Sequence, residues 1–169
     1  LYVTLTPTPA SVDSILSIGG TFYNAECAVK YVIEESSFKW TGTEWKVFVP
    51  GAIELGKASL YTTAGTAKQL NIVPSENALN SKATNKSFGC ISGTGVLKNG
   101  TAIDGVTIKQ NRSGYLAITF SSECSVDDVI TIGGTFSSTG TGTAYTYMIE
   151  DTQFQWNGSA WAKYVPPVE

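Results

Sequence analysis

The sequence contains no histidine, and this absence narrows the chemistry that the chain can perform. Histidine is the commonest general base and metal ligand at neutral pH. Charge is also scarce: Asp, Glu, Lys and Arg make up 15% of the 169 residues, against about a quarter in an average domain. The net charge of −3 offers no basic excess to bind phosphates. We therefore expect no nucleic-acid partner.

Long apolar runs are missing too, and cysteine is sparse. No stretch approaches the roughly 20 apolar residues that span a bilayer, so we expect no membrane span. The three cysteines are Cys27, Cys90 and Cys124. Because their number is odd, at least one has no partner within the chain. We favour a Cys90–Cys124 bridge, with three buried thiols as the alternative.

What the chain does have is an internal repeat. Residues 11–22 (SVDSILSIGGTF) return at 125–136 (SVDDVITIGGTF), and residues 33–50 return at 149–166. The match extends backwards, so that the alternating segment 1–6 aligns with 115–120. A repeat of about 115 residues is domain-sized, longer than the units of solenoids or propellers. We therefore expect residues 1–50 to be the later part of a first repeat and residues 51–169 to be a complete second repeat.

Alternating apolar residues and turn dipeptides predict an all-β fold. Strand patterns recur between turn signals such as Asn99-Gly100 and Asp104-Gly105. Only residues 75–82 favour a short helical turn, with Ser75 as its cap. Seven to nine short strands per repeat resemble the Ig-like modules of secreted and cell-surface proteins. That resemblance implies an antiparallel β-sandwich with little or no helix.

Each copy also carries a hairpin that contains two tryptophans. A two-residue loop that begins with glycine predicts a type II′ turn, at Gly42 and again at Gly158. This register places the tryptophans of each copy directly opposite one another. Flat indole faces favour carbohydrate contact or a protein interface if they are exposed, and a core role if they are not. The candidate aromatic residues are Trp40, Trp45, Trp156 and Trp161.

Acidic pairs, Glu34-Glu35 and Glu150-Asp151, also occur in both copies. Carboxylates can bind Ca²⁺, but the spacing of a calcium loop is absent, and adjacent acids on a strand point to opposite faces. Two carboxylates can also hydrolyse glycosides, yet a duplicated β module without insertion loops has little to build a cleft from. We therefore predict no metal site, no cofactor and no enzymatic activity.

Four N-x-S/T sequons fit a Thr-, Ser- and Gly-rich extracellular surface. The glycosylation candidates are Asn85, Asn99, Asn111 and Asn157. Sequence and composition together favour an extracellular or cell-surface location, with glycans as further possible partners.

The incomplete first repeat decides the functional hypotheses. Residues 1–50 lack the strands that correspond to 51–114, and an incomplete domain exposes apolar side chains and strand edges. Three arrangements resolve this. The sequence is a window from a longer tandem array, or residues 1–114 fold as one domain and leave 115–169 to be completed by the next chain. In the third, residues 51–114 bridge two small sheets, one from each copy. The leading hypothesis is a non-catalytic structural or adhesive protein, with copies of itself or neighbouring repeats as head-to-tail partners. The alternative is a carbohydrate-binding module that uses the paired tryptophans.

Overall fold

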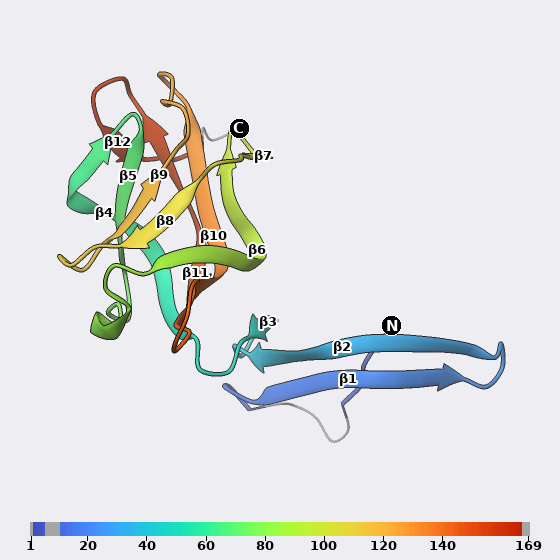
Figure 1. Cartoon of the computed structure of the whole chain (residues 1–169). Coiled ribbons are helices and arrows are strands. Elements are labelled where there is room, and N and C mark those ends of the chain that lie inside the picture. The colour runs from blue at the N-terminus through green and yellow to red at the C-terminus, as the bar shows by residue number, and fades with distance from the viewer. Residues whose placement is uncertain (1, 6–10, 167–169) are drawn as a thin grey trace. The chain divides into compact units, whose positions relative to one another are not determined.

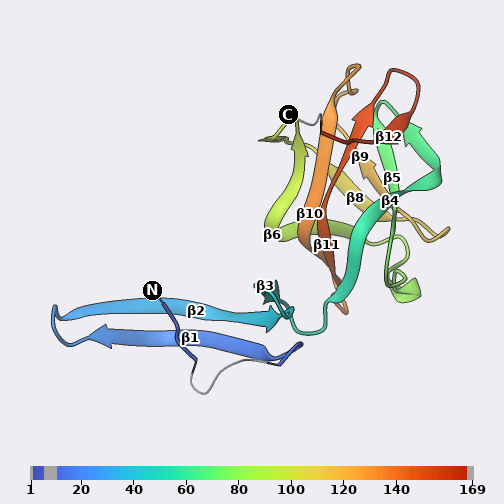
Figure 2. The same ribbon diagram turned by 180° about the vertical axis from the view of Figure 1, so that it is seen from behind.

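A computed structural model describes residues 2–5 and 11–166. The chain divides into two compact units, Leu1–Gly51 and Ala52–Glu169 (Figures 1 and 2). Each unit has a sheet of its own. The described residues contain strands and one 3₁₀ turn, so the all-β prediction is confirmed.

The first unit is a three-stranded antiparallel sheet. Its strands are β1 (Ile15–Asn24), β2 (Val29–Trp40) and β3 (Trp45–Phe48), in the order β1-β2-β3. Every described side chain of this unit is exposed or half-exposed. Residues 2–5 form no strand, so the prediction of a strand at 1–6 is wrong for the described part, while Leu1 and Thr6 lie outside it. The equivalent strand of the second copy pairs with strands that have no counterpart in residues 1–51.

The second unit is a closed, mixed β-barrel of seven strands, and the sandwich prediction is therefore wrong. Around the barrel the order is β10-β11-β4-β5-β9-β8-β6, and β6 pairs with β10 to close the ring. The short strands β7 and β12 add to β6 and β11. The strands are β4 (Ile53–Thr66), β5 (Gln69–Pro74), β6 (Ser87–Lys98), β7 (Thr101–Ala102), β8 (Thr107–Gln110), β9 (Leu116–Thr119), β10 (Val129–Ser138), β11 (Thr146–Trp156) and β12 (Trp161–Lys163).

Two long strands explain why the sheet closes. β6 pairs with β8 near its start and with β10 over most of its length, with positive φ at Gly93 and Gly95. β4 pairs in parallel with β11 over its first part and antiparallel with β5 over the rest. The Ig-like pattern has no such parallel pair, because its two sheets are antiparallel. Figure 1 shows β4 curving along this path.

The barrel core contains the aliphatic residues Leu55, Leu70, Ile72, Ile118, Ile130 and Ile132 and the aromatic residues Phe136, Tyr147, Phe154, Trp156 and Trp161, all buried. The 3₁₀ turn η1 (Ser81–Ala83) overlaps only the last two residues of the helical turn predicted at 75–82. Its cap is Asn80, whose side chain accepts from Lys82 N, so the prediction of Ser75 as the cap is wrong.

Candidate functional site

The two copies of the repeated sequence adopt the same three-stranded arrangement. We call β1–β3 the open sheet and β10–β12 the closing strands of the barrel. In the open sheet Ile15 pairs with Lys39, and in the closing strands the equivalent Val129 pairs with Gln155. Both pairings shift register at the Gly-Gly pair, between Ile18 and Gly20 in one copy and at the same place in the other. The repeat is therefore conserved in backbone pairing as well as in sequence.

The tryptophan hairpins have the predicted register in both copies. Trp40 pairs with Trp45, and Trp156 pairs with Trp161. The ring centroids are 5.4 Å apart in each pair, with interplanar angles of 50° and 57°. Because the two rings of a pair are tilted against one another, they do not form one flat platform.

The environments of the two hairpins differ. In the barrel Trp156 and Trp161 are 7% and 4% exposed. The indole Nε1 of Trp161 donates hydrogen bonds to the carbonyl oxygens of Thr66, at 2.9 Å, and Gln69, at 3.1 Å. In the open sheet Trp40 and Trp45 are half-exposed. The second hairpin is thus part of a core, and only the first has indole surface available for another molecule.

The equivalent tyrosines of the two copies differ even more in burial than the tryptophans do. Tyr147 of β11 is fully buried; its hydroxyl donates to Gln110 Oε1 at 2.7 Å and accepts from Asn80 N at 3.0 Å. Burial raises the pKa of Tyr147 above its ordinary value, while the hydrogen bond from Asn80 lowers it by less. The equivalent Tyr31 of β2 is 46% exposed.

The buried hydrophobic side chains of the closing strands have close counterparts in the open sheet. Seven of these eight are identical, and the eighth changes only from Ile to Leu. The pairs are Ile130 and Leu16, Ile132 and Ile18, Phe136 and Phe22, Tyr147 and Tyr31, Ile149 and Ile33, Phe154 and Phe38, Trp156 and Trp40, and Trp161 and Trp45. We call the open-sheet members of these pairs the inward set. Positions on the other face vary more: Tyr23, Lys30 and Lys39 replace Ser137, Thr146 and Gln155.

The strand edges differ in the same way. In the barrel β10 is hydrogen-bonded on both edges, to β11 and to β6, and β11 also pairs with β4. Within the described residues β1 pairs with β2 alone, and β2 pairs with β1 and, over Ser37–Trp40, with β3. Backbone groups that are satisfied in the closing strands are therefore available on the open sheet.

The predicted sequons lie at or near the surface of the barrel. Asn85, Asn99 and Asn157 are exposed and Asn111 is half-buried. Asn99 is already engaged, because its Nδ2 donates to Asp128 Oδ1 at 2.8 Å and its Oδ1 accepts from Val129 N at 2.8 Å. A glycan on Nδ2 of Asn99 would disturb this contact, so the other three are the better acceptors.

All three cysteines are free thiols in the structure, so the expected Cys90–Cys124 bridge is not formed. Cys27 and Cys90 are exposed, and the Sγ of Cys90 donates to the carbonyl oxygen of Ser92 at 3.3 Å. Cys124 is buried in the barrel core, and its backbone N donates to the carbonyl oxygen of Ala67 at 2.7 Å. Burial raises the pKa of the Cys124 thiol, which keeps it protonated and unreactive.

A polar network at the start of β10 was not recognised from the sequence. Asp128 is buried and accepts hydrogen bonds from Asn99 and from Ser125 N, and Lys98 Nζ lies 2.9 Å from its Oδ2. Burial alone would raise the pKa of Asp128, but the hydrogen bonds from Lys98, Asn99 and Ser125 outweigh it and hold this pKa below its usual value. The sequence marks Asn99-Gly100 as a turn, but it does not indicate that Asn99 bonds to the buried Asp128.

The acidic pairs do not converge on a site. Among the described residues no group of three or more His, Cys, Asp or Glu is placed to hold a metal. Asp151 accepts a hydrogen bond from Thr94 Oγ1 at 2.8 Å, and Glu150 is exposed. The described part of the chain also has no helix long and apolar enough to cross a bilayer.

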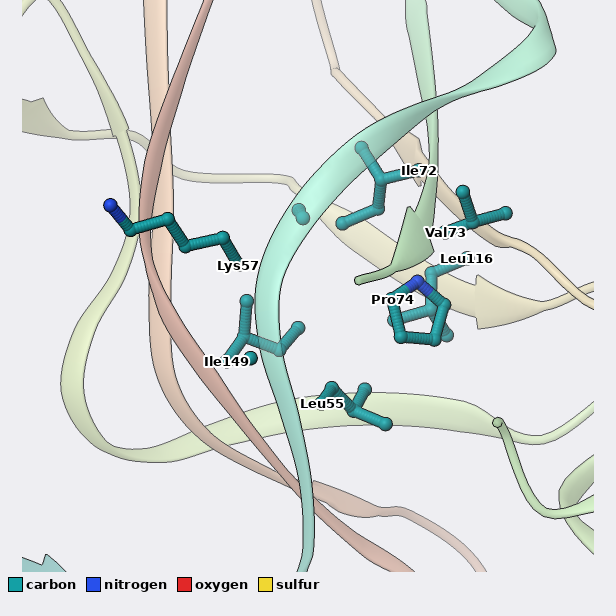
Figure 3. Close-up of a pocket in the computed structure, with 9 residues that line it drawn as sticks. Leu55, Lys57, Ile72, Val73, Pro74, Leu116 and Ile149 are labelled. Carbon is teal, nitrogen blue, oxygen red and sulfur yellow. The ribbon is translucent and has the colours of Figure 1, made fainter. Parts of the chain in front are cut away.

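A small hollow lies beside β4 in the barrel (Figure 3). Its walls come mainly from Leu55, Ile72, Leu116 and Ile149, and Lys57 points away from them in the figure. The volume of this hollow is about 10 Å³, far below the 300–1,000 Å³ of typical ligand pockets. This hollow is too small and too apolar to orient a polar substrate.

Comparisons with protein-family models, with curated proteins and with solved structures found no match to this chain. Function is therefore inferred from the molecule's own geometry. Its most informative feature is a three-stranded element that is core in one copy and open in the other.

Proposed function

We propose that the chain is a non-catalytic structural or adhesive protein of the extracellular space or cell surface. It would consist of glycosylated β-barrel repeats that join head to tail by strand complementation in a stalk, fibre or surface array. One observation carries this proposal: the open sheet has the strand pairing and the inward side chains of the closing strands, but not the strands that cover them.

Further features support this role. The chain has no histidine and little charge, and the hollow beside β4 is smaller than a ligand pocket. Exposed sequon asparagines at positions 85 and 157 suit a glycosylated surface. An open sheet with free edges and apolar side chains favours association with another chain.

The alternative, a carbohydrate-binding module, depends on the first hairpin, because the indoles of the second are buried.

A titration with soluble polysaccharides tests the two functions against each other. Tryptophan fluorescence reports binding, and negative-stain images of the same sample report polymers. We expect ordered polymers and no saturable change in fluorescence on adding saccharide. A saturable change in a sample that stays monodisperse would contradict the structural role and favour the binding module.

A further inference from the structure

We propose that the open sheet is the acceptor for residues 52–124 of a second copy of this chain. This inference rests on the proposed structural function and names the partner and register of assembly. In the joined state, β1–β3 of one copy would occupy the place that β10–β12 hold in the barrel of the other.

The donor surface for this contact is visible in the barrel itself. Residues 52–124 supply β4, β5, β6, β8 and β9, which cover the inward face of the closing strands. They also supply specific polar partners: the carbonyls of Thr66 and Gln69 for an indole, and Asn80 N with Gln110 Oε1 for a tyrosine hydroxyl. The open sheet presents Trp45 and Tyr31 at the equivalent positions.

Both edges of the open sheet match the donor. The free edge of β1 corresponds to the edge of β10 that pairs antiparallel with β6. The free part of β2 corresponds to Tyr147–Glu150 of β11, which pair in parallel with β4. Where β10 lies against β6, position 134 must be glycine, because a Cβ on Gly134 would lie 2.4 Å from the carbonyl oxygen of Ser92. The open sheet has Gly20 at this place, where a Cβ would meet nothing within 4 Å.

A second copy is the occupant that the sequence favours. The inward set repeats seven of the eight buried hydrophobic residues of the closing strands, so residues 52–124 would bury nearly the same apolar side chains in either pairing. Exchange of like elements between chains is a low-cost route to association. The exchange also releases residues 125–166 of the donor, which then present the same inward face to a third copy. Such a contact is heterologous and extends head to tail.

Sedimentation velocity of the full chain over a wide concentration range tests this register. The wild type is expected to form a series of oligomers whose mean mass rises with concentration. Phe22→Ser removes an inward ring that is 39% exposed in the open sheet and whose counterpart Phe136 is 2% exposed. It should raise the concentration needed for assembly at least about tenfold.

Two further variants separate assembly from folding. Tyr31→Phe keeps the ring and loses only the hydroxyl, so it should raise the required concentration roughly fivefold without disturbing the hairpin. Val32→Ser is the matched control, because Val32 is 79% exposed and its counterpart Met148 lies outside the core. It should assemble like the wild type.

The possible results separate the proposed register of assembly from the proposed structural role. Polymers that form equally well with Phe22→Ser and Tyr31→Phe would overturn the proposed register and leave the structural role standing. A wild type that stays monomeric at all concentrations and binds saccharide would overturn both. Assembly lost in the inward variants and kept in Val32→Ser is the result we expect.

Discussion

Tyr147 and Tyr31 occupy the same place in the two copies, but within the described residues only the hydroxyl of Tyr147 has hydrogen-bond partners. A buried donor or acceptor that loses its partner costs about 1–3 kcal/mol. Tyr147→Phe leaves both Asn80 N and Gln110 Oε1 short of a bond inside the barrel. It should lower the free energy of unfolding by about that amount, measured by urea denaturation in dilute solution.

Tyr31→Phe is the matched control for this measurement. Tyr31 is exposed, and the partners of the equivalent Tyr147 hydroxyl, Asn80 and Gln110, lie outside the open sheet. In a dilute sample its free energy of unfolding should equal that of the wild type. Equal destabilisation by the two variants would contradict the distinction between core and open positions.

Asp128 predicts a specific dependence of stability on pH. Its folded pKa lies below the unfolded value of about 3.9. Its stabilising contribution is therefore complete above that value and is lost as the pH falls through the lower folded pKa. Between pH 6 and pH 3 the wild type should lose more stability than Asp128→Asn, and for one carboxyl with this unfolded pKa the difference is at most about 1 kcal/mol.

Gly134 allows β10 to lie close to β6, and Gly20 is the equivalent residue in the open sheet. Gly134 and Gly20 both have positive φ, 103° and 108°, so alanine is strained at either position. Only at Gly134 does the new Cβ also collide with β6. Gly134→Ala should destabilise the barrel by about 3 kcal/mol, whereas Gly20→Ala should leave barrel unfolding unchanged. Chemical denaturation of both variants checks this, and equal effects would contradict it.

Local elements could be predicted from the sequence, because their signals are short-range. The Trp40–Trp45 and Trp156–Trp161 registers follow from a glycine-first turn and period-2 alternation, and both are confirmed. The hairpin at Asn99-Gly100 is confirmed as well, since Lys98 pairs with Thr101. Turn chemistry fixes which residues face one another across two adjacent strands.

Closure of the barrel could not be predicted, because it depends on pairings between distant segments. The parallel contact of Ile53 with Tyr147 and the antiparallel contact of Val96 with Ile132 leave no mark in alternation or turn residues. Short strands with turns between them fit two open sheets as well as one closed sheet. The buried network around Asp128 was missed for the same reason, since Lys98 and Asn99 lie about thirty residues away in sequence.

In the whole molecule, the proposed assembly makes the open sheet of one copy compete with the closing strands of another for the surface of residues 52–124. Weakening the closing strands should therefore favour assembly. Gly134→Ala should assemble at a lower concentration than the wild type, as seen by sedimentation. The double variant Gly134→Ala with Phe22→Ser should not, because its acceptor is impaired. Equal assembly of the single and double variants would indicate ordinary aggregation of a destabilised barrel.

Hydrogen exchange on the amides of β1 that do not bond to β2 tests the account most directly. In dilute solution the free edge of β1 has no protein partner among the described residues, so these amides should exchange rapidly. At concentrations where oligomers form they should become protected, as those of β10 are in the barrel. Polymers in which the β1 edge still exchanges rapidly, or a β1 edge protected in the dilute monomer, would contradict the claim.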